Sequence, residues 1–216
     1  MISWGIAMPP RTIIYVEGII GAGKSTFINE LSKRIPSIVT HQEPVDSWVR
    51  CGIFNRFYSD MKRWATSFQL KVLFDKVRAI NSMTDDAGIH VVERSVYSDA
   101  CFVNTVYKFG FVDDFEYALI EEARNTCEVK HLPDAIIYIR PDLDTCMTRA
   151  TSRGRDGENN VTREYQMELM KHHDDMFHKH KMTTQGGTKI PIVVLADNDV
   201  DDRLITHLKC KIPGLN

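Results

Sequence analysis

The sequence contains little cysteine, and its cysteines are far apart. It has five, with no C-x-x-C pair: Cys51, Cys101, Cys127, Cys146 and Cys210. An odd, scattered set of this kind is not typical of a disulfide framework or of a structural zinc site, whose ligands come in closely spaced pairs. We therefore expect reduced thiols, as in a cytoplasmic protein.

The sequence also lacks long hydrophobic runs and an excess of charge of one sign. No stretch approaches the roughly 20 apolar residues of a membrane-spanning helix. Residues 1–10 have neither the charged start of a secretion signal nor the Arg and Ser of a transit peptide, and we interpret them as a loose leader. Lys and Arg total 27 against 29 Asp and Glu, a net charge of −2, which gives no indication of a nucleic-acid or membrane partner.

What the sequence does have is an alternation of short apolar runs and helical patterns. Five runs rich in β-branched residues predict strands at Thr12–Val16, Ile38–His41, Ile89–Val92, Ala135–Ile139 and Ile192–Leu195. Strands that alternate with helices indicate a parallel sheet covered on both faces. No linker or repeat divides the 216 residues, so we predict an α/β protein of one domain.

Helices are predicted between these strands. They comprise a first helix that ends before Pro36, a segment Trp48–Met83 in two pieces that break near Ser59–Asp60, Val96–Lys108, Asp114–Cys127, a helix that begins at Pro141–Asp142, a long helix from about residue 160 to about Lys181, and a last helix to about Lys209.

A phosphate-binding motif follows the first predicted strand. The segment Gly18–Ser25 (GIIGAGKS) fits G-x-x-x-x-G-K-[ST] and lies between a buried strand and an amphipathic helix, as that motif requires. Glycines let backbone N–H groups surround the β-phosphate, while the lysine neutralises phosphate charge and the serine binds Mg²⁺. The residues predicted to bind ATP or GTP here are Gly18, Gly21, Ala22, Gly23, Lys24, Ser25 and Thr26.

Glu43 follows the second predicted strand, and Pro44 favours an extended conformation for it. The carboxyl end of a strand in an α/β sheet opens onto the ligand crevice. A carboxylate there can accept a proton from an attacking hydroxyl group but would repel an acceptor that is already a phosphate dianion. Glu43 therefore favours a hydroxyl acceptor over a nucleoside monophosphate. The alternative is an ordinary loop carboxylate near the start of a helix.

Several further motifs occur in a specific order. They are EGIIGAGKST at Glu17–Thr26, EPVDSW at Glu43–Trp48, the spacing from Tyr58 to Phe68 and Gln69, ERSVYSD at Glu93–Asp99, and RATSRGRDGE at Arg149–Glu158. From about Ile13 to about Asp199 the chain resembles the deoxynucleoside kinases, in the branch that holds the deoxycytidine, deoxyguanosine, mitochondrial thymidine and insect broad-specificity kinases.

The resemblance implies a P-loop NTPase-type three-layer sandwich with a five-stranded parallel sheet and a small Arg-rich lid over about residues 149–160. It also implies ATP and Mg²⁺ as cofactors, a homodimer, and transfer of the ATP γ-phosphoryl group to a deoxyribonucleoside 5′-hydroxyl in deoxynucleotide salvage.

The resemblance also assigns roles to individual residues. Glu43 would be the base that takes the 5′-hydroxyl proton, and Lys24, Arg94, Arg149 and Arg153 would be the other catalytic groups. The lid arginines Arg149, Arg153 and Arg155 would bind the phosphates. The alternative is that this basic segment is simply the solvent-exposed end of a helix, as most such segments are. Mg²⁺ would be held by Ser25 and Glu93. The residues assigned to the deoxynucleoside are Trp48, Tyr58, Phe68, Gln69, Lys76, Arg94, Asp99 and Glu158, with Tyr58 and Glu158 at the 3′-hydroxyl group and Gln69 at the base edge.

Three positions depart from the family pattern. Ile19 replaces an Asn in the phosphate loop, which should matter little because the loop uses its backbone there. Ala100 stands where relatives commonly have Arg, and nothing in the sequence explains it. Lys76 replaces an Arg that pairs with the equivalent of Asp99 in deoxycytidine and deoxyguanosine kinases, and a lysine cannot fork across a base edge.

Our hypothesis is that Lys76 and Asp99 face the base and disfavour the methyl group of thymine, which leaves deoxycytidine, deoxyadenosine and deoxyguanosine as substrates. The alternative is that Lys76 reaches solvent and Asp99 caps or pairs locally. Three other functions remain as alternatives: a thymidine-preferring kinase, a nucleoside monophosphate kinase and a regulatory nucleotide-binding subunit. The presence of Lys24, Glu43 and Arg94 counts against the last.

The His-rich run at residues 172–180 could suggest a metal site. Its helical spacing places His173, Met176, Phe177 and His180 on one partly apolar stripe, so we interpret it as a packing or dimer face.

Overall fold

The five predicted strands form one sheet in which every strand is parallel to its neighbours. The computed structural model describes residues 11–84, 87–155, 157–179, 182–183, 187–212 and 215. The strands lie in the order β2-β3-β1-β4-β5. Their bounds are β1 (Thr12–Glu17), β2 (Ile38–His41), β3 (Ile89–Glu93), β4 (Ala135–Ile139) and β5 (Ile192–Leu195). All five strand predictions are confirmed to within one residue, whereas the predicted leader lies outside the described residues.

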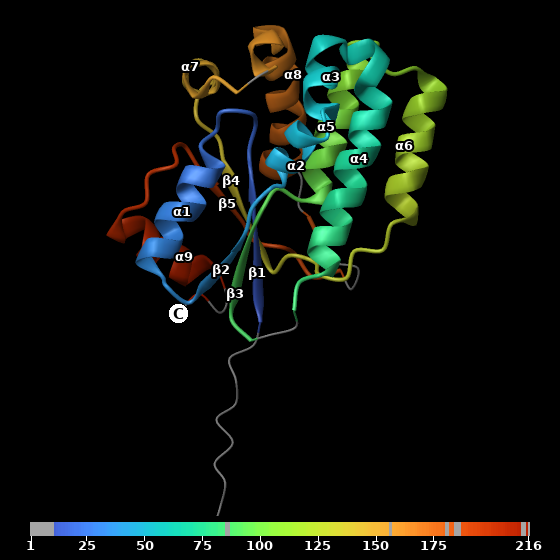
Figure 1. Cartoon of the computed structure of the whole chain (residues 1–216). Coiled ribbons are helices and arrows are strands. Elements are labelled where there is room, and N and C mark those ends of the chain that lie inside the picture. Colours follow the sequence, from blue (N-terminus) through green and yellow to red (C-terminus); the bar gives the residue numbers. More distant parts are fainter. Residues whose placement is uncertain are drawn as a thin grey trace, which may run out of the picture.

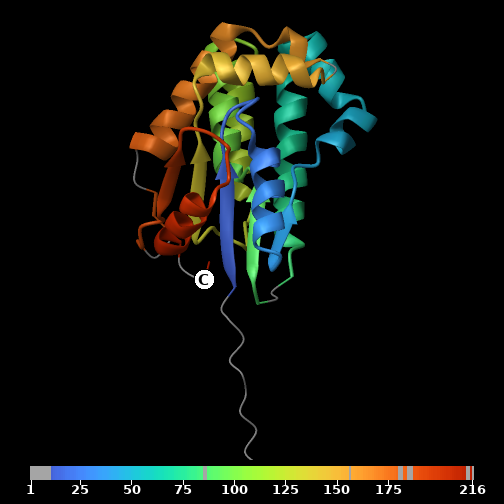
Figure 2. The same cartoon turned by 90° about the vertical axis from the view of Figure 1, so that its left-hand side faces the viewer.

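Helices cover both faces of the sheet, as predicted (Figure 1). One face carries α1 (Lys24–Arg34) and α9 (Asp202–Lys211), which lie together in the view turned by 90° (Figure 2). The other face carries α4 (Met61–Asn81), α5 (Val96–Lys108) and α8 (Arg163–His173), and α6 (Asp114–Thr126) packs on α4 and α5. The short helices α2 (Val45–Arg50) and α3 (Ile53–Ser59), together with α7 (Leu143–Arg153), lie toward the carboxyl ends of the strands.

The helical segment after β2 differs from the prediction. It begins at Val45 rather than Trp48 and has three pieces rather than two. Gly52, at a left-handed φ of 78°, separates α2 from α3, since a glycine adopts this conformation without strain. The predicted break near Asp60 is confirmed, and the Asp60 side chain accepts a hydrogen bond from the backbone N–H of Arg63 at the start of α4.

The long helix predicted after residue 160 is also corrected. α8 ends at His173 and continues as a π-helical segment, Asp174–Lys179. Asp174, at this junction, accepts hydrogen bonds from Arg140 Nε at 2.7 Å, Arg140 Nη2 at 2.8 Å and the Tyr138 hydroxyl at 2.8 Å. These three bonds fix the wider turn against the end of β4.

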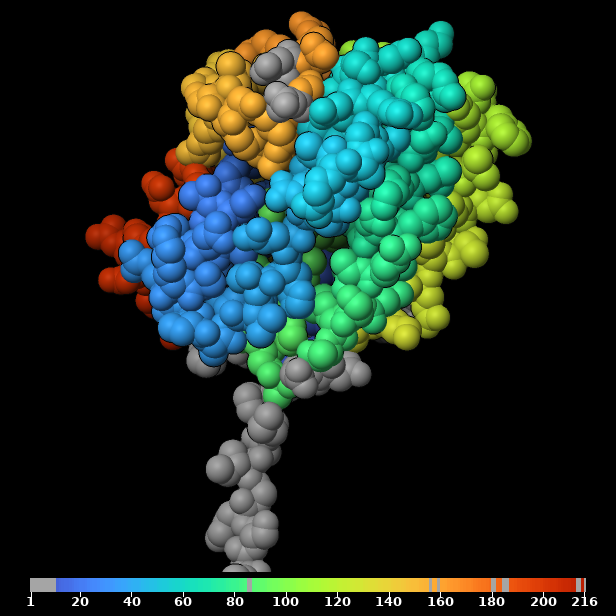
Figure 3. All heavy atoms as spheres, in the orientation of Figure 1, coloured from blue at the N-terminus to red at the C-terminus, as the bar shows by residue number. Residues whose placement is uncertain are grey.

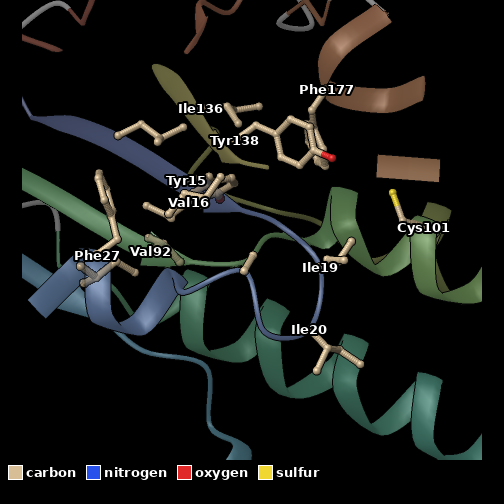
Figure 4. Packing of buried hydrophobic residues seen from close by; sticks show 14 of the residues in the cluster. Tyr15, Val16, Ile19, Ile20, Phe27, Val92, Cys101, Ile136, Tyr138 and Phe177 are labelled. Carbon is tan, nitrogen blue, oxygen red and sulfur yellow. The ribbon is translucent and has the colours of Figure 1, made fainter. Parts of the chain in front are cut away.

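The hydrophobic core lies on both sides of the central strands (Figure 4). Phe27 of α1 is fully buried on one side, and on the other the ring of Tyr138 lies 5.6 Å from that of Phe177. Complete burial of such side chains stabilises the fold by about 1.5–3 kcal/mol each. The five cysteines are unpaired, as predicted. Within the described ranges, no helix has the length and apolar composition needed to cross a bilayer.

Candidate active site

A cavity of about 510 Å³ lies at the carboxyl ends of β1, β2 and β3. Its walls come from the phosphate loop after β1, the segment after β2, helices α2 to α5 and the residues after α7. Figure 3 shows a hollow on this face between the segment after β2, α2 and α4. All eight residues predicted to contact the deoxynucleoside line this cavity. So do Ser25, Glu43 and Glu93, together with Lys24, Arg153 and Arg155.

The phosphate loop has the conformation that its motif predicts. Gly21 and Gly23 have positive φ values of 80° and 92°, and a Cβ atom on Gly21 would lie 2.0 Å from the carbonyl oxygen of Cys146 in α7. Glycine is therefore required at position 21 both for its φ value and for the close approach. Gly21 lines the cavity, whereas Gly18, Ala22, Gly23 and Thr26 belong to the loop and the start of α1 outside its wall.

Lys24 is almost completely buried at the base of this loop. Its Nζ atom donates a hydrogen bond to the carbonyl oxygen of Ile19 at 3.0 Å. Burial, helped by the nearby charge of Arg94, lowers the pKa of Lys24 to about 7. Phosphate oxygens would restore the charge of the lysine, because an anion nearby favours the ammonium form.

Ser25 and Glu93, the residues predicted to hold Mg²⁺, are hydrogen-bonded to each other. The Ser25 hydroxyl group donates to Glu93 Oε1 at 2.8 Å. Hydroxyl and carboxylate oxygens are ligands that Mg²⁺ prefers, and the ion commonly takes its remaining ligands from water and substrate phosphates. Among the described residues, no group of three or more His, Cys, Asp or Glu side chains could hold a metal ion.

The His-rich run contributes to packing where the structure describes it. His173 is fully buried, and its Nδ1 atom donates to the carbonyl oxygen of Leu169 at 2.8 Å. Its ring packs against those of Phe102, Tyr138 and Phe177. This agrees with the packing interpretation of the run, of which His180 lies outside the described residues.

Four charged side chains alternate in sign along one wall of the cavity, and three of them, Arg94, Lys76 and Asp99, are buried. Arg94 Nε contacts Glu43 Oε2 at 3.2 Å, and Lys76 Nζ contacts Glu43 Oε1 at 3.3 Å. Lys76 also forms an ion pair with Asp99. The side chains of Lys76 and Asp99 are only 5% and 4% exposed, so the alternative that Lys76 reaches solvent is wrong. Burial alone would raise the pKa of Glu43, but Lys76, Arg94 and Lys24 outweigh it and lower that pKa below its usual value.

Arg94 has an unusual backbone conformation. Its φ of 62° makes it the one non-glycine residue with a positive φ in the described part of the chain. The guanidinium group lies 4.7 Å from the ring centroid of Phe102, a cation–π contact that the sequence did not indicate. Its Nη1 atom is buried and has no hydrogen-bond partner among the described residues, so it is a donor that a ligand could use.

Aromatic side chains form the opposite part of the cavity. The rings of Trp48 and Phe68 lie 5.9 Å apart, edge to face. The Trp48 indole N–H donates to Asp75 Oδ2 at 2.9 Å, and Asp75 is a further residue that the motifs did not identify. Gln69 Nε2 and Asp99 Oδ2 are buried without a partner among the described residues. Both residues line the cavity, which leaves an amide donor and a carboxylate acceptor for a bound molecule.

The predicted lid places its arginines in two groups. Arg153, at the end of α7, and Arg155 both pair with Glu158, the latter at 3.3 Å. Arg149 instead contacts Asp197, at 2.8 Å, in the segment after β5 and is not part of the cavity wall. The roles of Arg149, Arg153 and Arg155 in catalysis and phosphate binding stay predictions.

Comparison with known proteins agrees with this geometry. The chain matches the deoxynucleoside kinase family over residues 14–210. It is 31% identical to a probable deoxycytidine kinase of fowlpox virus over 88% of this chain and 81% of the relative. It is also 28% identical to a deoxyadenosine/deoxycytidine kinase of Bacillus subtilis (90% and 86% covered) and to the human deoxycytidine kinase (86% and 84% covered). The resemblance of the motifs is thus confirmed, and the chain belongs to the deoxynucleoside kinases, a family of phosphotransferases that act on a hydroxyl group.

Proposed function

We propose that the protein transfers the γ-phosphoryl group of ATP to the 5′-hydroxyl of deoxycytidine or a purine deoxynucleoside, and that this reaction serves deoxynucleotide salvage. The observation that carries the base preference is the pair of unpartnered polar atoms, Gln69 Nε2 and Asp99 Oδ2, on residues of the cavity wall. An unpartnered buried donor or acceptor is costly, so a substrate that satisfies both gains affinity over one that does not.

The chemistry of the bases separates the candidates. An amide N–H group donates to a ring acceptor, and a carboxylate accepts from an exocyclic amino group. Cytosine and adenine present a ring nitrogen acceptor next to such an amino group, and guanine presents a carbonyl acceptor next to N–H donors. Thymine presents an N–H donor between two carbonyl acceptors and has no amino group, so it offers Asp99 Oδ2 a ring N–H in place of the amino group of cytosine or adenine. The thymidine-preferring alternative is disfavoured by the methyl group of thymine, which the Lys76–Asp99 pair would exclude.

The same wall supports the proposed phosphoryl transfer. Glu43 would take the proton of the 5′-hydroxyl group as its oxygen attacks the γ-phosphorus atom and the bond to the ADP oxygen breaks. Arg94 would hold the hydroxyl group beside Glu43, and Lys24, Arg153 and Arg155 would stabilise the negative charge of the phosphates. Ser25 and Glu93 would hold Mg²⁺, which neutralises phosphate charge when bound.

We also propose that the protein is a cytoplasmic homodimer. Exposed large apolar side chains on two neighbouring helices support a dimer: Phe74 on α4, and Phe115 and Leu119 on α6. Light scattering of the purified protein should give about twice the chain mass of 24.8 kDa. A mass near that of one chain at micromolar concentration would contradict the dimer.

The function is tested with a substrate panel. The purified protein is incubated with ATP and Mg²⁺ and with each of the four deoxynucleosides, with dTMP as control, and the mono- and diphosphates are quantified. We expect 5′-monophosphates of deoxycytidine and the purine deoxynucleosides, little from thymidine, and a loss of about 100-fold or more in the Glu43→Gln variant. Phosphorylation of dTMP alone, or ATP binding without any product, would overturn the proposal.

A further inference from the structure

Glu17, the last residue of β1, is a buried carboxyl group that the proposed reaction does not use. Its side chain is fully buried, and no ion pair joins it to a cation in the described part of the chain. Glu17 Oε1 accepts a hydrogen bond from the Ser95 hydroxyl group, and Glu17 Oε2 has no partner among the described residues. Burial raises the pKa of Glu17 to about 7, although the hydrogen bond from Ser95 opposes this. A carboxyl group in such a position is costly to bury, which calls for a structural or functional reason.

The positions of Glu17 and Ser95 in the chain suggest that reason. Glu17 directly precedes Gly18, where the phosphate loop begins, and Ser95 directly follows Arg94. β1 and β3 are neighbours in the sheet, so the turns that follow them lie side by side. The backbone N–H of Arg94 donates to the carbonyl oxygen of Val16 at 3.0 Å, and the bond between Glu17 and Ser95 is a second tie between the same two turns.

Arg94 needs such support because of its backbone. A non-glycine residue in the left-handed region is strained and persists only where its surroundings fix it. Ser95 supplies three bonds next to it. Its hydroxyl group donates to Glu17 and accepts from the backbone N–H of Tyr97 at 3.1 Å, which caps α5, and its carbonyl oxygen accepts from the Ser98 hydroxyl group at 2.9 Å.

We propose that Glu17 and Ser95 are positioning residues, whose hydrogen bond holds the left-handed turn at Arg94 and so keeps its guanidinium group against Glu43. Neither Glu17 nor Ser95 is part of the cavity wall, so an effect on the reaction must pass through residues that are. The proposal rests on the roles proposed above for Arg94 and Glu43. Its first test, however, does not depend on activity.

The first test observes Arg94 directly by NMR. In protein labelled with ¹⁵N at arginine Nε, the Arg94 resonance is assigned by its loss in Arg94→Lys. We expect this resonance to shift or broaden in Glu17→Ala and Ser95→Ala, and to change less in Glu17→Gln, whose amide oxygen can still accept from Ser95. Asp174→Asn is the matched control, because it alters a partly buried, hydrogen-bonded carboxylate that is not in the cavity wall. An unchanged Arg94 resonance in folded Ser95→Ala would overturn the proposal, even if Glu17→Ala did not fold.

The second test uses turnover of the best deoxynucleoside. Misplacement of a catalytic group by about 1 Å can cost on the order of 100-fold, so Glu17→Ala and Ser95→Ala should lower kcat by about 10- to 100-fold, with partial recovery in Glu17→Gln. The Kd for ATP should stay within about threefold, and in the Arg94→Lys background the same changes should cause little further loss. A parallel loss of ATP affinity, or full additivity with Arg94→Lys, would assign Glu17 to the phosphate loop instead. A wild-type protein without kinase activity would refute the proposed function, and the NMR test would still decide the positioning role.

Discussion

Replacing Lys76 by Met should raise the pKa of Glu43. Lys76 Nζ lies 3.3 Å from Glu43 Oε1, and the side chains of Lys76 and Glu43 are 5% and 14% exposed. Arg94 and Lys24 also lower the pKa of Glu43, and Asp99 lies on the far side of Lys76. Methionine preserves much of the shape of the lysine and removes its charge together with its hydrogen bonds to Glu43 and Asp99, so the change removes the whole polar contribution of Lys76.

The size of the effect follows from this distance. Two unit charges 3.3 Å apart attract by about 5 kcal/mol at an effective dielectric constant of about 20. If relaxation and solvent cancelled about two thirds of this, the remaining about 1.7 kcal/mol would still equal about one pKa unit. In the proposed reaction the active form of Glu43 is the ionised one. The acidic limb of the pH profile should therefore move to higher pH by at least about one unit, with the larger loss of activity at low pH.

The assay is kcat/KM for the best deoxynucleoside between pH 5 and 9. Lys76→Arg keeps the charge and should keep the acidic limb in place. Lys71→Met is the matched control, because Lys71 is a lysine of the same helix that pairs with Asp75 and not with Glu43. An acidic limb that is unchanged in Lys76→Met, or that moves equally in Lys71→Met, would refute the reasoning.

Three further predictions concern the walls of the cavity. Because the pKa of Lys24 is lowered to about 7, the lysine is largely neutral at pH 8, so ATP binding should take up a proton there; calorimetry in two buffers of different ionisation enthalpy measures this, and a heat independent of the buffer would contradict it. Asp75→Ala removes the acceptor of the Trp48 indole N–H, a bond worth about 1 kcal/mol. We expect a rise of about fivefold in KM for the deoxynucleoside with little change in kcat, and an unchanged KM would exclude this role. Gly21→Ala would place a Cβ atom 2.0 Å from the carbonyl oxygen of Cys146 at a φ of 80°, so ATP affinity and Tm should both fall. Calorimetry and thermal unfolding measure these two quantities, and a variant with both unchanged would contradict the prediction.

The elements of the fold were largely predictable because they depend on local patterns. Each strand is a short continuous apolar run, and the phosphate loop has a motif that specifies its conformation. The pairing of Lys76 with Asp99 was predicted from the resemblance and is confirmed as an ion pair. The break between α2 and α3 was missed although a signal was present, since Gly52 is the kind of residue that ends a helix.

Other contacts had no signal in the sequence. The contact of Lys76 with Glu43 depends on how α4 is rotated against the segment after β2, which periodicity does not determine to within one side chain. The left-handed φ of Arg94 occurs at a residue type that rarely adopts it, so only tertiary structure reveals it. Glu17 looked like part of the phosphate-loop motif, and its bond to Ser95 joins residues 78 positions apart.

The pairing of Glu158 with both Arg153 and Arg155 has a consequence for how the two substrates influence each other. Glu158 lies in the cavity wall with Tyr58, and Asn160 ties its segment to the backbone of Tyr58 at 2.9 Å. A triphosphate that binds both arginines would compete with the carboxylate of Glu158 and release it toward the sugar. Binding free energies are reciprocal, so each substrate should raise the affinity for the other. A tighter deoxynucleoside Kd in the presence of a non-hydrolysable ATP analogue, abolished in Glu158→Gln, is the expected result of this thermodynamic coupling, and an equal Kd with and without the analogue would exclude it.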